Sequence, residues 1–327
     1  MLHQKLGYPL YMPEPDRNLP IAYRMNGISI GDVGRITPDG AFDFLFNICS
    51  PADDPMNPSV LPEKFEFFTG FDVSTQELFG PETDILSQNV TCIGHFPATY
   101  QCTSSKGAIL ELPDGAVLTD TQSKACFRNY AARHAEDWYR YMNVCRGRDA
   151  PNGSLYLVTG CIKSTSWAIA TFDRPSCPGD YLQFVTPCDL PPQQINGYMP
   201  SRRSHHWKRA SGTIGRAGPS STDLAVVGAQ NQCTFLRGFK ITLQSDVWNR
   251  LVTSVSVTAA NGVSNTDSSL FGPGPTNYHS SCPSSDSSVS STRYSYTNGT
   301  SWLSSVVGST VPLDQLVIVP LLLPKVE

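Results

Sequence analysis

The sequence predicts an α+β protein with a twisted, mainly antiparallel sheet, one long amphipathic helix at about 120–143 and a flexible Ser-rich C-terminal tail. Apolar residues recur at helical spacing in one segment only. Short stretches rich in β-branched and aromatic residues, bounded by Gly, Pro and Asp, lie on both sides of that segment. Because these strands are clustered and do not alternate with helices, we expect an antiparallel sheet.

The N-terminal part of the chain has strand and turn character. In the segment 27–48, two apolar stretches flank the sequence Thr-Pro-Asp-Gly at 37–40, which favours a tight turn, so a hairpin is expected here. Further along, Ala108 to Leu112 predicts a short strand that Pro113-Asp114-Gly115 closes.

The predicted helix is the element with the clearest periodicity. Thr119 and Gln122 have the spacing of a capping box at its start. Its apolar stripe is rich in aromatic residues, so we expect it to pack on the sheet, with a membrane-surface or partner-binding helix as the alternative. The stripe consists of Phe127, Tyr130, Ala131, His134, Trp138, Tyr141 and Met142.

The segment 153–172 follows the helix and resembles a strand that leads into a phosphate-binding loop. Such a loop needs a glycine before its lysine, but Ile162 precedes Lys163, and the residues that follow favour a strand, not a helix. The segment therefore predicts a hairpin whose turn is Cys161 to Ser166. Two more strands are expected, at 181–186 and at Cys233 to Leu243, where alternate residues are apolar.

The chain is expected to divide at about residue 250. Residues 1–250 predict a single α+β domain, and residues 251–327 a tail rich in Ser, Gly and Pro with a short apolar run near its end. That run is shorter than the ~20 residues of a membrane-spanning helix. The first residues lack the basic flank and apolar core of a signal peptide. We therefore expect a cytoplasmic protein that associates with membranes only by recruitment.

The net charge of -4 conceals an uneven distribution. Residues 1–120 hold 16 acidic and 6 basic residues, whereas residues 121–327 hold 12 acidic and 18 basic residues. No acidic residue occurs between Asp189 and Asp223. This window is either a solvated basic loop or a surface for an anionic partner. Its candidate lipid-binding residues are Arg202, Arg203, Trp207, Lys208, Arg209 and Arg216. The pI of about 5.9 argues against a dedicated nucleic-acid binder.

Motifs of catalysis or metal binding are lacking in the sequence. It has no G-x-S-x-G segment and no CxxC pair among its 10 cysteines, which we expect to be mostly reduced and buried. His205-His206 has no further ligands nearby. We therefore assign no catalytic, cofactor-binding or metal-binding residue and expect no cofactor. An enzyme whose site is assembled from distant residues stays open.

Several segments together resemble a family of proteins of mushroom-forming (basidiomycete) fungi to which no activity is assigned. They cover roughly residues 7–245 and include GYPLYMPEPDRNLP, GISIGDVGRITPDGAFDFLFNIC, AILELPDGA, GSLYLVTGCIKSTSW, NQCTFLRGFKITL and the helix from Tyr130 to Tyr141.

The order of the elements is more remotely similar to the pore-forming domain of gasdermins. Leu155 to Thr159 and Cys233 to Leu243 take the places of a strand after the helix and of a late strand. The resemblance implies that the protein binds acidic lipid and inserts amphipathic hairpins as a homo-oligomer, with a role in cell death. The alternative that the sequence leaves open is a non-enzymatic protein-interaction module without membrane activity.

Overall fold

The computed structural model describes residues 6–95, 97–177, 180–186, 205–209, 213–220, 223, 225–226, 228–262 and 317–320. The chain divides into two compact units, Met1–Leu251 with Gln315–Glu327 and, separately, Val252–Asp314. Most of the second unit, including the predicted Ser-rich tail at 264–310, lies outside the described residues. The fold below is that of the first unit.

Strands dominate the described fold, and every strand pair is antiparallel, as the sequence predicts. The strands are β1 Tyr8–Pro9, β2 Asp32–Ile36, β3 Phe42–Asn47, β4 Ser74–Phe79, β5 Thr83–Leu86, β6 Val90–His95, β7 Ala98–Cys102, β8 Gly107–Leu112, β9 Ala116–Asp120, β10 Leu155–Ser164, β11 Trp167–Phe172, β12 Leu182–Val185, β13 His206–Arg209, β14 Thr213–Gly218, β15 Gln232–Thr242 and β16 Val317–Pro320. The helices are α1 Ile21–Asn26, α2 Lys124–Arg140, the π-helical turn η2 Tyr141–Cys145 and α3 Ser245–Gly262.

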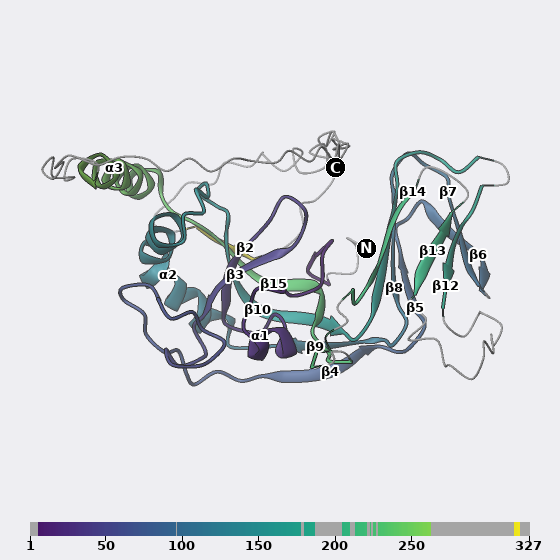
Figure 1. Ribbon diagram of the computed structural model, residues 1–327, viewed down its shortest axis with the longest axis horizontal. Helices are drawn as coiled ribbons and strands as arrows, with labels where there is room; N and C mark the ends of the chain where they lie inside the picture. The colour runs from purple at the N-terminus through teal and green to yellow at the C-terminus, as the bar shows by residue number, and fades with distance from the viewer. Residues whose placement is uncertain are drawn as a thin grey trace, which may run out of the picture. The chain divides into compact units, whose positions relative to one another are not determined.

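These strands form three sheets. Sheet A has the order β1-β15-β10-β2-β3, with β16 paired to β15, β9 to β10 and β4 to β9. Sheet B has the order β14-β11-β8-β5, and sheet C the order β13-β12-β7-β6. Figure 1 shows the strands of sheet B stacked beside those of sheet C. The predicted hairpin within 27–48 is confirmed, because β2 pairs with β3 across the turn at 37–41.

Four long arms pass through all three sheets. The first arm (74–95) contains β4, β5 and β6, and the second arm (98–120) contains β7, β8 and β9. The third arm (155–185) contains β10, β11 and β12, and the fourth arm (206–242) contains β13, β14 and β15. In each sheet the four arms lie in the order first, second, third, fourth. The arms therefore make one four-stranded antiparallel ribbon that is folded twice.

The predicted hairpin within 153–172 is wrong. β10 and β11 do not pair with each other; they follow one another along the third arm, β10 in sheet A and β11 in sheet B. The two residues between them make a bend, which the Ser164 hydroxyl stabilises by donating a hydrogen bond of 2.6 Å to the Ser166 carbonyl. Pro113-Asp114-Gly115 ends β8, as the sequence predicts, and the second arm then bends into β9 of sheet A.

The helices differ from the prediction at several points. α2 begins at Lys124, because β9 extends to Asp120 and excludes the capping box of Thr119 and Gln122. Ser123 at its N-terminus makes no side-chain capping bond. The sequence predicts no second helix at Ser245–Gly262, where α3 lies.

The apolar stripe of α2 is buried. Phe127, Ala131 and Trp138 lie in one core cluster with Leu155 and Phe239 of sheet A. Aromatic residues of the loop 58–72 cover the same helix, and the Phe68 ring lies 4.8 Å from that of Phe127. Because its apolar stripe packs against both sheet A and the loop 58–72, α2 belongs to the core beside sheet A.

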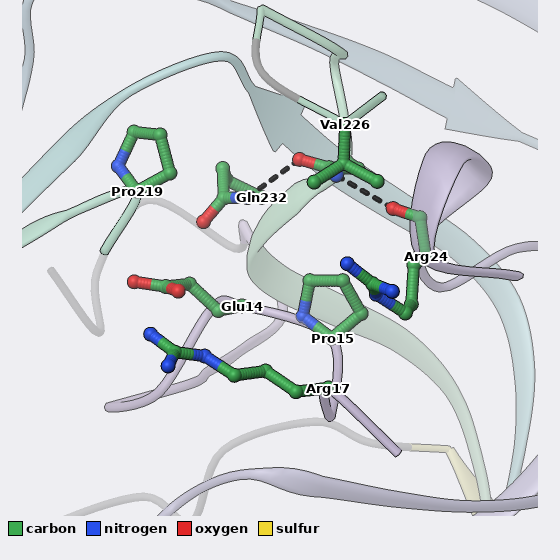
Figure 2. A pocket seen from close by; sticks show the side chains of 8 residues that line it. Glu14, Pro15, Arg17, Arg24, Pro219, Val226 and Gln232 are labelled. Atoms are coloured by element: carbon green, nitrogen blue, oxygen red, sulfur yellow. Dashed lines mark hydrogen bonds between the residues drawn. The ribbon is translucent and has the colours of Figure 1, made fainter. Parts of the chain in front are cut away.

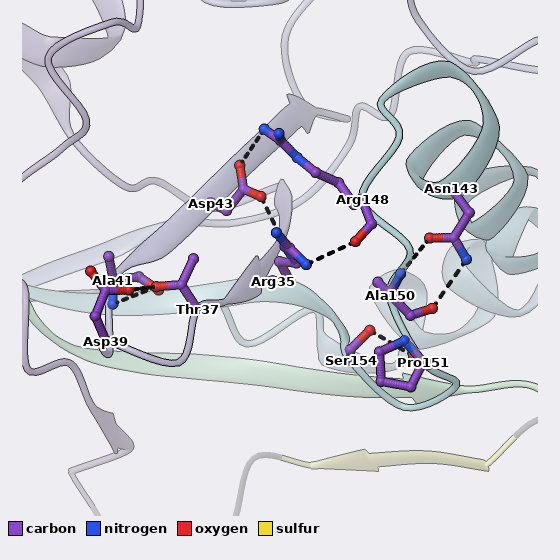
Figure 3. Close-up of polar contacts among 10 residues, drawn as sticks. All are labelled: Arg35, Thr37, Asp39, Ala41, Asp43, Asn143, Arg148, Ala150, Pro151 and Ser154. Atoms are coloured by element: carbon purple, nitrogen blue, oxygen red, sulfur yellow. Dashed lines mark hydrogen bonds and ion pairs between the residues drawn. The ribbon is translucent and has the colours of Figure 1, made fainter. Parts of the chain in front are cut away.

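Asp43 joins hairpin β2–β3 to the loop after α2 (Figure 3). Its carboxylate accepts a bond of 2.9 Å from Arg35 Nε and one of 2.8 Å from Arg148 Nη2. Arg35 Nη1 also donates to the Arg148 carbonyl. One carboxylate between two guanidinium groups fixes the loop that leads into β10, and so positions the start of the third arm.

Within the described ranges, none of the helices has the length and apolar character needed to cross a membrane.

Candidate functional site

The bends between sheets A and B lie side by side in three of the four arms. Asp114, in the bend of the second arm, accepts hydrogen bonds of 2.6 Å from the hydroxyls of Thr165 and Ser166 in the third. The Glu82 amide of the first arm donates to the Pro113 carbonyl. Burial acts to raise the pKa of Asp114, but the hydrogen bonds from Ser166 and Thr165 hold it below its ordinary value. These arms are therefore tied together at the level where the ribbon bends.

Gly115 is required at this bend. It has a φ of +73°, and a Cβ there would lie 2.4 Å from the Phe79 carbonyl oxygen of the neighbouring arm. No other residue type fits that approach.

Sheets B and C pack face to face. Their shared core contains Ile109, Ala168, Ala170 and Phe172 of sheet B and Tyr100, Leu182 and Phe184 of sheet C. The outer face of sheet B carries a second core, which includes Leu110, Leu112 and Ile169. Sheet C therefore buries most of its apolar side chains against the inner face of sheet B.

A carboxyl group lies inside this sandwich. Glu111 of β8 is 5% exposed. The Tyr100 hydroxyl of sheet C donates a hydrogen bond to the Glu111 carboxylate, and its oxygen also lies 3.3 Å from Asp84 Oδ2. Burial raises the pKa of the Glu111 carboxyl to about 7, although the bond from Tyr100 acts in the opposite direction. Ionised Glu111 is therefore an unfavourable occupant of the closed sandwich.

The second arm changes face at the corner 103–106 between sheets C and B. Inside the sandwich, Tyr100 and Cys102 are even-numbered, whereas Ile109 and Glu111 are odd-numbered. In a straight strand, residues of equal parity share a face. Straightening this arm would gather most of its apolar residues on one face, namely Ala98, Tyr100, Cys102, Ala108, Leu110 and Leu112. Glu111 would then lie on the other face with Thr99, Gln101 and Thr103.

The candidate lipid-binding residues are not gathered on one surface. Trp207 points into the sandwich, where its ring lies 5.1 Å from that of Phe184 and its Nε1 donates to the Arg216 carbonyl. Lys208, the next residue of β13, is exposed on the opposite face of sheet C. Arg216 lies on the far face of sheet B, with its guanidinium 5.2 Å from the centre of the Tyr11 ring. Arg202, Arg203 and the side chain of Arg209 lie outside the described residues.

Lys163, in the segment that resembles a phosphate loop, belongs to strand β10. It lies opposite Cys233 of β15, and its Nζ donates a bond of 2.9 Å to the Asn26 carbonyl. No helix follows it, since the chain bends into β11. The lysine therefore has a structural partner and no phosphate cradle.

Another buried carboxyl, Asp32, is satisfied by its own neighbours. It accepts hydrogen bonds from Tyr23 Oη at 2.9 Å, from the Ser29 amide at 2.9 Å and from Asn47 Nδ2 at 2.6 Å. Burial raises the pKa of Asp32 to about 6. The group has no face toward solvent, being 0% exposed, so we assign it to the stability of hairpin β2–β3.

Reactive and metal-binding groups do not converge in the part of the chain that the structure describes. There, no cluster of three or more His, Cys, Asp or Glu side chains could hold a metal ion. The eight described cysteines are free, and only Cys102, Cys161 and Cys233 are buried, so the expectation of mostly buried thiols is wrong. A pocket between Glu14, Arg17, Arg24 and Pro219 has an inner volume of ≈ 20 Å³, room for about one water molecule (Figure 2).

Comparisons of the chain with protein-family models, with curated proteins and with solved structures find no match.

Proposed function

We propose that the protein is recruited from the cytoplasm to membranes that contain acidic lipid and permeabilises them. In this proposal, sheets B and C separate and the two hairpins of the ribbon straighten. Several copies then combine their straightened hairpins into one membrane-inserted assembly. Sheet A and α2 keep their fold and remain outside the bilayer.

The observation that carries the proposal is the position of Glu111. The closed sandwich buries this carboxyl among apolar side chains, whereas a straight second arm would carry it on the polar face. The same change would align the apolar residues of the arm on the opposite face. The buried carboxyl, together with a sequence that suits a straight conformation of the same strand, supports the proposal of a closed state that opens.

The arms are long enough for this role. From Thr83 to His95 the first arm has 13 residues in sheets B and C, which would extend over ~43 Å at ~3.3 Å per residue. From Ala98 to Leu112 the second arm has 15 residues. The hydrocarbon core of a bilayer is ~30 Å thick, so both arms of this hairpin would cross it.

Separation of the sheets would also expose Trp207, one of the candidate lipid-binding residues. Trp207 is held between sheets B and C, while Lys208 and Arg216 lie on opposite sides of the sandwich. A straight fourth arm would free the Trp207 ring for the membrane interface, where tryptophan is favoured. We therefore expect the cations to act first in binding and Trp207 only after opening.

Dye leakage from lipid vesicles tests the proposal. We expect the full chain to release dye from vesicles with acidic lipid and not from neutral ones. Replacing Arg202, Arg203 and Lys208 with glutamine should weaken vesicle binding by roughly tenfold or more, with a larger effect at low salt. The matched control replaces three exposed cations of α2, Arg128, Arg133 and Arg140. An absence of both binding and leakage with acidic vesicles would refute the proposal.

A second candidate function is a non-enzymatic protein-interaction module. It is favoured by the outer strands β6 and β13 of sheet C, since outer strands present backbone groups that an extended peptide can pair with. Specific capture of a protein partner by a chain that binds no vesicles would favour this alternative.

A further inference from the structure

The fourth arm bends differently from the other three. Its corner lies between β14 and β15, at 219–231, and the corner residues that the structure describes make none of the hydrogen bonds to Asp114 that tie the third arm to the second. Of this corner the structure describes 219–220, 223, 225–226 and 228–231. Its described residues are held by Arg24 of α1, which forms an ion pair of 2.5 Å with Asp223, and by the segment 6–17.

The N-terminal segment 6–17 first pairs with the fourth arm in sheet A. Tyr8 and Pro9 lie opposite Leu236 and Phe235 of β15, and the Cys233 amide donates a bond of 2.9 Å to the Pro13 carbonyl. Leu10 is 1% exposed in the core that these strands share. This half of the segment is therefore an integral part of the fold.

The second half of the segment reaches the corner itself. The Glu14 carboxylate accepts two bonds of 2.8 Å, one from the Ser220 amide and one from the Ser220 hydroxyl. Arg17 Nη2 donates a bond of 2.9 Å to the same hydroxyl. Figure 2 shows Glu14 between Pro219 and Arg17, and Arg24 next to Pro15; all five residues line the narrow pocket. All of these bonds are solvent-exposed and so individually weak.

We propose that Glu14 and Arg17 form an autoinhibitory latch that holds the fourth arm in its bent conformation. The inference rests on the proposed function, because a latch regulates only a ribbon that straightens. Straightening would move Ser220 away from sheet A, while Leu10 keeps the N-terminal segment on β15. The bonds of Glu14 and Arg17 to Ser220 must therefore break before the second hairpin opens.

The test compares the wild-type chain with the double variant Glu14→Gln, Arg17→Gln, which leaves the net charge unchanged. The control is Glu136→Gln, Arg140→Gln, which removes an exposed acid–base pair with an N–O distance of 3.2 Å on α2. We expect the latch variant to release dye from acidic vesicles roughly tenfold faster than the wild type, and the control to match the wild type. Hydrogen exchange of the β14 amides without lipid should be faster in the latch variant alone.

The two readouts separate the latch from the proposed function. Faster exchange together with faster leakage supports the latch. Unchanged exchange, or faster exchange with leakage at the wild-type rate, overturns it. If neither protein releases dye while exchange is faster, the proposed function fails, and the contact is only a structural clamp.

Discussion

Replacement of Glu111 with glutamine is expected to stabilise the protein at pH 8 and to slow vesicle leakage. The carboxyl has a pKa of about 7 in the fold, whereas an exposed glutamate has one near 4.5. The closed state therefore binds the proton more tightly than the unfolded state does. The stabilisation from protonated Glu111 is complete below about pH 4.5 and is lost as the pH rises through about 7.

The expected size follows from the same shift. A difference of two to three pKa units corresponds to on the order of 3 kcal/mol between pH 4 and pH 8. Glutamine keeps the shape of the side chain without the charge, so its variant should lose this part of the pH dependence. Urea unfolding at both pH values measures the effect, with the exposed Glu77→Gln of β4 as control. Equal stabilities of wild type and Glu111→Gln at pH 8 would contradict the role assigned to Glu111.

Replacement of Gly107 with cysteine is expected to give a protein whose leakage is switched off by oxidation. A Cβ at position 107 would lie 2.5 Å from the native Cys102 Sγ, so the new thiol reaches its partner across the corner 103–106. The disulfide would fix the corner at which the second arm changes face, and the arm could not straighten. Leakage from acidic vesicles should fall at least tenfold under oxidising conditions and return on reduction.

Two controls accompany this variant. The Cβ would also lie 2.7 Å from Val90 Cγ2, so the neighbouring side chain must shift, and Gly107→Ser reports that steric effect without a thiol. Gly107→Cys combined with Cys102→Ser cannot form the bond and should leak equally under both conditions. Full leakage from the oxidised, disulfide-bonded protein would show that the second arm need not straighten.

The sequence predicted strands where β2, β3, β8, β10, β11, β12 and β15 lie, but it predicted neither the strands of the first arm nor the path of the arms. Turn residues such as Pro113-Asp114-Gly115 mark a change of direction, and local sequence does not say whether the chain reverses or merely bends. The choice depends on partners far away in the sequence. The second arm bends at Asp114 together with the third arm, because the hydroxyls of Thr165 and Ser166 donate hydrogen bonds to the Asp114 carboxylate. For the same reason, the sequence at 153–172 predicted a hairpin where the third arm only bends.

The candidate site was partly visible in the sequence. The predicted strand AILEL carries Glu111 between two leucines, a charge within an apolar run, which was a usable signal. Its burial could not be foreseen, because it depends on sheet C folding over sheet B. The cations between Asp189 and Asp223 were also visible in the sequence. Which side chains of this segment face the sandwich was not visible, because Trp207 and Lys208 take opposite faces only once β13 is paired with β12.

The distance between probes at Thr99 and Ala108 of the second arm tests the central claim most directly. These residues lie on the outer faces of the stacked sheets C and B, which pack about 10 Å apart, so probes there should be separated by ~20 Å in solution. In a straight strand the nine residue steps from Thr99 to Ala108 span ~30 Å. We predict that this longer distance appears on acidic vesicles and not on neutral ones. The account would be contradicted if acidic vesicles leak while the two probes, on those vesicles, keep the same separation that they have in solution.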